Sequence, residues 1–152
     1  EPIAWLTRED GSVVIGRGEM RPSPTAPVDG VAFYKRDFGT THSDAWFIPE
    51  RHEILTPDEL IKQLPAATSL DIAWDPIDTV AFSEVFQEIN NAIRTGRFEK
   101  TVPVVTETGT CHSFKPLELM GAMAGCRSPL RSYGFAVGAC GFAGATPELL
   151  LS

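Results

Sequence analysis

Helical spacing of apolar residues occurs in only three stretches of this chain, and the segments between them are short and interrupted by glycine and proline. The clearest helix is predicted to begin at Asp78 as N-cap and to end at Gly96, with Arg94 in its last turn. Its apolar residues recur at helical spacing; they are Phe82, Val85, Phe86, Ile89 and Ile93. So few helices exclude a regular alternation of strands and helices.

The other two predicted helices carry their own start signals. Thr56-Pro57-Asp58-Glu59 combines a capping threonine, a proline at the first helical position and a glutamate that completes a capping box. This helix should run to about Leu64, before Pro65. A shorter helix is predicted over Lys115–Ala124, entered through Pro116.

The remaining segments predict strands and loops. Ala4–Thr7 and Ser12–Ile15 indicate a hairpin about Glu9-Asp10-Gly11, and residues 16–30 are predicted to form a loop because they are rich in glycine and proline. Further strands are predicted over Val31–Lys35, Ala45–Ile48, Leu70–Trp74, Thr101–Thr106, Ser132–Val137, Cys140–Ala143 and Glu148–Leu151. The order of elements favours an α+β fold in which helices pack on a largely antiparallel sheet.

Composition narrows the function classes. The chain has 152 residues, 43% of them apolar, which suits one domain with a core, and Trp5, Trp46 and Trp74 are expected in that core. A net charge of −7 argues against nucleic-acid binding, and the apolar runs are too short to span a membrane. Three cysteines without a CxxC motif, and no signal peptide, predict reduced, buried thiols in a cytoplasmic protein. We expect no metal site among these residues.

The two ends of the chain predict a part of a larger protein. The chain starts without Met and stops within the apolar run Leu149-Leu150-Leu151. We expect exposed apolar strand edges near that run, and hence self-association or poor solubility unless another segment covers them.

Two residues stand where chemistry is possible. Lys100 follows the predicted helix stop at Gly96, at the start of a predicted strand. Glu148 enters an apolar strand, where a carboxylate is costly to bury unless it is paired or protonated, and the small residues before it would let a ligand approach the backbone. The alternatives are a surface lysine at a strand end and a glutamate that faces solvent.

Two segments that contain these residues resemble the chorismate-binding enzyme superfamily. The first segment is Ile89-x-x-Ala92-Ile93-x-x-Gly96-x-x-x-Lys100-x-Val102-x-Val104, and the second is Gly141-Phe142-x-Gly144-Ala145-Thr146-Pro147-Glu148-Leu149-Leu150-Leu151. They stand in the family's order, and Glu148 comes 48 positions after Lys100. Lys100 resembles the lysine that stands at this position in family members that use water, whereas members that use ammonia have glutamine there. The chain therefore resembles the N-terminal part of an isochorismate synthase.

This resemblance implies a fold, a reaction and a site. Residues 1–152 would form an incomplete chorismate-binding domain, part of the family's α/β sandwich, with its C-terminal part missing. Lys100 would be the general base that activates water for attack at C2 of chorismate, and Glu148 the general acid that protonates the departing C4 hydroxyl. Gly144, Ala145 and Thr146 would contact the substrate. The family uses Mg²⁺, whose ligands are expected outside this chain.

The resemblance leaves several alternatives open. The product could be salicylate or another chorismate-derived aromatic compound, in pathways such as those to menaquinone or siderophores. The chain could be a fragment, or it could act only with a complementary chain. It could also be a non-catalytic binding or interaction domain. Thr146 and Pro103 depart from the family's usual residues, and Pro103 removes a backbone donor from its predicted strand.

Overall fold

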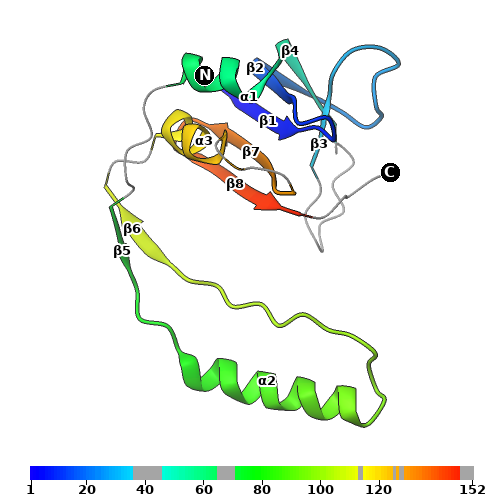
Figure 1. Ribbon diagram of the computed structural model, residues 1–152, viewed down its shortest axis with the longest axis vertical. Helices are drawn as coiled ribbons and strands as arrows, with labels where there is room; N and C mark the ends of the chain where they lie inside the picture. Colours follow the sequence, from blue (N-terminus) through cyan, green and yellow to red (C-terminus); the bar gives the residue numbers. More distant parts are fainter. Residues whose placement is uncertain (36–45, 65–70, 113–114, 125, 127–128, 148–152) are drawn as a thin grey trace. The chain divides into compact units, whose positions relative to one another are not determined.

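Figure 1 shows the computed structural model, which describes residues 1–35, 46–64, 71–112, 115–124, 126 and 129–147. The chain divides into two units. The first comprises Glu1–Ser69 and Phe114–Ser152, and the second comprises Leu70–Ser113.

A six-stranded sheet organises the first unit, in the order β3-β4-β2-β1-β7-β8 (Figure 1). Every neighbouring pair in it is antiparallel. The strands are β1 (Ile3–Thr7), β2 (Val13–Ser23), β3 (Phe33–Tyr34), β4 (Trp46–Leu55), β7 (Arg131–Val137) and β8 (Cys140–Thr146). With two helices on this sheet, the α+β, antiparallel prediction is confirmed.

The first hairpin forms as predicted, but the loop expected to follow it does not begin where predicted. β1 pairs with β2 from Thr7 opposite Val13, whereas β2 continues through Gly16 and Gly18 as far as Ser23. It continues because β4, itself longer than the predicted 45–48 strand, supplies a second partner. Gly18, at φ +85°, lies in the irregularity that interrupts the β2–β4 register.

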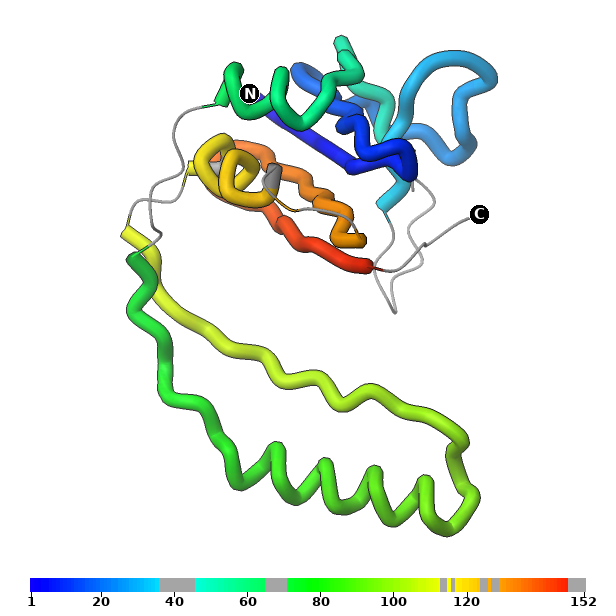
Figure 2. Tube along the Cα trace, in the orientation of Figure 1, coloured from blue at the N-terminus to red at the C-terminus, as the bar shows by residue number. Residues whose placement is uncertain are grey.

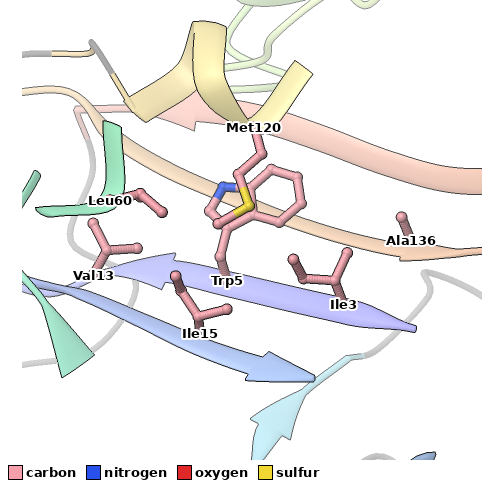
Figure 3. Packing of buried hydrophobic residues seen from close by; sticks show 7 residues of the cluster. All are labelled: Ile3, Trp5, Val13, Ile15, Leu60, Met120 and Ala136. Atoms are coloured by element: carbon pink, nitrogen blue, oxygen red, sulfur yellow. The ribbon is translucent and has the colours of Figure 1, made fainter. Parts of the chain in front are cut away.

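Two helices cover one face of the sheet and close its core. α1 (Pro57–Gln63) begins with the predicted capping box: the Glu59 N–H donates to Thr56 Oγ1 (3.3 Å), and the Thr56 N–H donates to Glu59 Oε2 (2.8 Å). α3 (Pro116–Ala124) packs beside it, against β7 and β8. Figure 3 shows the resulting core, which consists of Ile3, Trp5, Val13, Ile15, Leu60, Met120 and Ala136.

The second unit contains α2 (Thr79–Arg94) and a short antiparallel pair, β5 (Ile72–Trp74) with β6 (Gly109–Cys111). Figure 2 traces the chain from β5 through α2 and back to β6. Asp78 caps α2 by accepting from the Val80 and Ala81 N–H groups (3.1 and 3.0 Å). The helix ends at Arg94, and Gly96 follows at φ +75°. Both predicted ends of this helix are therefore confirmed.

Three expectations fail. Residues 101–106 form no strand, because β5 pairs with β6 instead and offers residues 101–106 no ladder. Trp74 is 60% exposed, in contrast to Trp5, because the β5–β6 pair is too short to build a core around it. The three cysteines are free, as predicted, but none of them is buried: Cys111 and Cys126 are half-buried, and Cys140 is exposed because it begins an edge strand. In the described part of the chain, no helix is long and apolar enough to cross a membrane.

Candidate functional site

Lys100 lies just beyond the end of α2, in the second unit. The Arg97 N–H donates to the Ala92 carbonyl (2.9 Å), so the chain turns away from the helix axis after Gly96. The Lys100 side chain is exposed, and it has no hydrogen bond or ion pair with any described residue. The second unit therefore does not bury the amine that the predicted general base requires.

The segment after Lys100 is extended but unpaired. Val102 and Val104 are 69% and 82% exposed, and no ladder pairs residues 101–107. Thr108 is already held beside β5, since its carbonyl accepts from the Asp75 N–H (2.8 Å). Pro103 contributes to the lack of pairing because it has no N–H to donate. The β-branched residues in the segment favour an extended backbone, but a strand also needs a neighbour.

Gly144, Ala145 and Thr146 occupy the end of β8, in the first unit. Gly144 lies opposite Tyr133 of β7, and a Cβ added at Gly144 would come within 2.7 Å of the Tyr133 hydroxyl. Glycine is therefore the residue that leaves space for the tyrosine ring. Ala145 is exposed, and Thr146 is half-buried opposite Arg131.

An aromatic row extends from this strand across the face of the sheet opposite to α1 and α3. Phe142 lies 6.5 Å from Tyr133 and 6.4 Å from Phe135, measured between ring centroids, and Phe135 lies 6.0 Å from Phe47. The rings come from three strands: Tyr133 and Phe135 from β7, Phe142 from β8 and Phe47 from β4. Only the strand order brings them together. The row makes this face of β7 and β8 apolar next to the backbone of Gly144.

Ser132 is a buried polar residue on the helix-covered face, 3% exposed. Its hydroxyl lies 3.0 Å from the Thr7 hydroxyl, and its N–H donates to Thr7 Oγ1 (3.1 Å). Glu118 on α3 is buried as well, 8% exposed, and accepts from Lys115 Nζ (2.9 Å). These contacts give both residues a structural role in the first unit.

The predicted acid, Glu148, lies outside the described residues. Lys100 belongs to the second unit and Gly144–Thr146 to the first. The pairing of a base at Lys100 with an acid at Glu148 therefore stays a prediction. The described residues contain no group of three or more His, Cys, Asp or Glu side chains that could hold a metal ion. These residues therefore do not form a site that fits Mg²⁺.

No family model, curated protein or solved structure matches this chain.

Proposed function

We propose that this chain contributes the general base and the general acid of an isochorismate synthase-type reaction, as the N-terminal part of a chorismate-binding domain. The proposal rests on the resemblance of two segments, in the family's order, to that superfamily. The observation that carries it is local: α2 ends at Arg94 and Gly96 follows it shortly before Lys100, and β8 ends with Gly144-Ala145-Thr146, two positions before Glu148 in the sequence.

The proposed chemistry assigns one proton transfer to each residue. Lys100, as the neutral amine, takes a proton from a water molecule whose oxygen forms a bond to C2 of the chorismate ring. The electron pair moves through the conjugated ring double bonds toward C4. The C4–O bond breaks, and Glu148 donates its proton so that the hydroxyl leaves as water. The overall change is an isomerisation, because one water is added and one is released.

The environment that these roles require is specific. A neutral lysine amine and a protonated carboxyl are both favoured by removal from water. Substrate held between Lys100 and Glu148 would exclude water from both side chains and would prevent the two from pairing as ions. The Gly144–Thr146 backbone, flanked by Tyr133 and Phe142, would form the apolar wall beside the substrate ring. The proposal also holds that the sheet belongs to the family's larger α/β sandwich.

Magnesium would hold the ring carboxylate and offset the charge of the dianionic substrate. Its ligands are expected outside this chain, as are most of the cationic contacts to the substrate. The net charge of −7 agrees with that expectation, since an acidic chain attracts a dianion poorly by itself. A complementary chain, or further polypeptide of the same protein, is therefore part of the proposal.

A chorismate turnover assay with Mg²⁺, with products identified by mass, tests this function. It compares the parent, Lys100→Ala, Glu148→Gln and the control Lys62→Ala, which removes an exposed lysine from α1. Each protein is assayed alone and with the complementary polypeptide. We expect isochorismate from the parent and the Lys62 variant in the presence of that polypeptide, and a loss of about 10²-fold or more in the other two.

Four other results have clear interpretations. Salicylate as the product would replace isochorismate synthesis by salicylate synthesis at the same residues. Turnover by the parent without any added polypeptide would show that the chain is a complete catalyst. Full activity in Lys100→Ala, or no turnover with every addition, would refute the proposal and favour the non-catalytic binding domain.

A further inference from the structure

The two edges of the six-stranded sheet differ in how they are protected. β3, at one edge, has only two residues, Phe33 and Tyr34, and Lys35 follows it. β8, at the other edge, has seven residues and contains no charge, no proline and no large β-branched residue. Long, uncharged edge strands are the ones that pair with other strands.

The hydrogen-bond pattern shows which groups of β8 point outward. The Arg8 N–H donates to the Ser12 carbonyl (2.7 Å), and the Gly18 N–H donates to the Pro2 carbonyl (3.2 Å). Hydrogen-bonded and non-bonded pairs alternate in an antiparallel ladder. The backbone N–H and C=O groups of Ala4 and Leu6 therefore point toward β2, and those of Ile3 and Trp5 point toward β7.

The same alternation continues across β7 to β8. Since Ile3 and Trp5 bond to Ala136 and Gly134, the β7 residues that bond to β8 are Tyr133 and Phe135. Their partners are Gly144 and Phe142. The backbone N–H and C=O groups of the intervening β8 residues therefore point away from the sheet; these residues are Gly141, Ala143 and Ala145. Within the described residues, no backbone hydrogen bond reaches them.

This edge is complementary to itself when two copies run antiparallel about Ala143. Ala143 then lies opposite the partner's Ala143, and Gly141 lies opposite the partner's Ala145. All of these are residues whose backbone groups point outward, so each pair can exchange two hydrogen bonds. A register shifted by one residue would oppose outward groups with inward ones and lose these bonds.

The side chains fit the same register. Between the bonded pairs, Phe142 lies opposite the partner's Gly144. An aromatic residue across from this glycine already occurs within the sheet, where Tyr133 covers Gly144. Phe142 is 46% exposed in one copy, and pairing would extend the aromatic row of Tyr133, Phe135 and Phe142 across the two-fold axis.

We propose that the β8 edge is a dimerisation strand that pairs antiparallel with β8 of a second copy of this chain, with the two-fold axis at Ala143. The contact is isologous, so every interaction occurs twice. This inference does not depend on the proposed enzymatic function.

Cysteine cross-linking tests the register. In a background with Cys111, Cys126 and Cys140 replaced by serine, Ala143→Cys should form a disulfide dimer on mild oxidation. Directly opposed residues of a bonded antiparallel pair have Cα atoms about 5.5 Å apart, within the range of about 4.4–6.8 Å that disulfides span. Ala139→Cys, in the β7–β8 turn, is the control and should not cross-link, since it has no counterpart near it in this register.

A mixture provides a second test that does not alter Ala143. A chain that keeps Cys140 as its single cysteine and a Thr146→Cys chain in the serine background should each fail to cross-link alone but should form a disulfide heterodimer when mixed, because residue 140 lies opposite the partner's residue 146 in this register. Sedimentation equilibrium of the unmodified chain should show a reversible dimer. Ala145→Pro removes an outward N–H at an exposed position and should weaken that dimer by about tenfold, with circular dichroism confirming that the variant is folded.

Several results would overturn the proposal. A parent chain that stays monomeric up to its solubility limit would do so, whether or not it binds a complementary polypeptide. A dimer of unchanged affinity in a folded Ala145→Pro variant would do so too. So would a dimer in which neither Ala143→Cys nor the mixed pair forms a disulfide.

Discussion

Gly134 is the position where one added methyl group should damage this fold most. It lies opposite Trp5 in the β1–β7 ladder, on the helix-covered face. A Cβ built at Gly134 would overlap the six-membered ring of Trp5, at its Cη2, Cζ2 and Cζ3 atoms. Trp5 is 2% exposed and lies in the core with Leu60 and Met120, so any movement of its ring must displace other core side chains (Figure 3).

The expected cost of Gly134→Ala follows from these contacts. Overpacking a core costs typically about 1–3 kcal/mol, and complete loss of a buried tryptophan costs about 3–5 kcal/mol. Displacing the Trp5 ring without losing all its contacts should therefore lower the free energy of unfolding by about 3 kcal/mol. At roughly 4–8 °C per kcal/mol, the melting temperature of the first unit should fall by about 15 °C.

Gly144→Ala is the matched control. The atom nearest to its added Cβ is the Tyr133 hydroxyl, at 2.7 Å, and Tyr133 is only half-buried on the other face of the sheet. Because the close contact is with the far end of a half-buried side chain and not with backbone, the cost should stay below about 1 kcal/mol. Urea unfolding followed by far-UV circular dichroism measures both variants against the parent.

The double variant Trp5→Phe/Gly134→Ala isolates the contact. If the clash is the cause, the smaller ring should make Gly134→Ala less costly than it is beside tryptophan. Gly134→Ala within about 0.5 kcal/mol of the parent would refute the reasoning. So would equal costs for the two glycine variants, or a cost at Gly134 that does not change when Trp5 is replaced.

Two further predictions concern polar contacts in the first unit. Thr56→Ala should lower the free energy of unfolding by about 1 kcal/mol and Thr56→Ser by much less, as measured by urea unfolding. Hydrogen bonds from the Thr56 N–H and hydroxyl lower the pKa of Glu59 below its usual 4.5. The stability that the ionised Glu59 contributes through these bonds is therefore present above pH 4.5 and is lost as the pH falls through the lowered pKa. An NMR titration should show the pKa of Glu59 rise in Thr56→Ala, and an unchanged titration would contradict this assignment. Thr7→Val should lower the free energy of unfolding by about 1–3 kcal/mol, because it leaves the buried Ser132 hydroxyl without its partner. Adding Ser132→Ala to Thr7→Val should recover part of that loss in thermal melts. Additive costs of the two substitutions would argue against a shared hydrogen bond.

The predictions that held depend on residues close together in the chain. The capping box at Thr56 and Glu59, and the start and stop of α2 at Asp78 and Gly96, each involve groups within a few positions of one another. The same holds for the turn that joins β1 to β2. Such contacts form with little loss of chain entropy, and their residue types are specific enough to recognise.

At the candidate site too, features set by nearby residues were predicted and features set by strand pairing were not. The position of Lys100 after a helix stop agrees with the sequence pattern, whereas β8 continues through Gly144 to Thr146, beyond its predicted end at Ala143. The strand expected over residues 101–106 is absent, although its composition favours one. Tyr133 beside Gly144 carried no signal of its own, because the two residues meet only through the β7–β8 register.

By itself, the sequence determined the helix ends, the first hairpin and the α+β class, since these follow from local backbone preferences and from the spacing of apolar residues. Contacts between distant segments set three further features: β2 continues to Ser23, Trp5 is buried while Trp74 stays exposed, and β8 forms an edge. Local patterns do not predict these features because a strand satisfies its backbone hydrogen bonds on a neighbour, and that neighbour can come from a distant part of the chain.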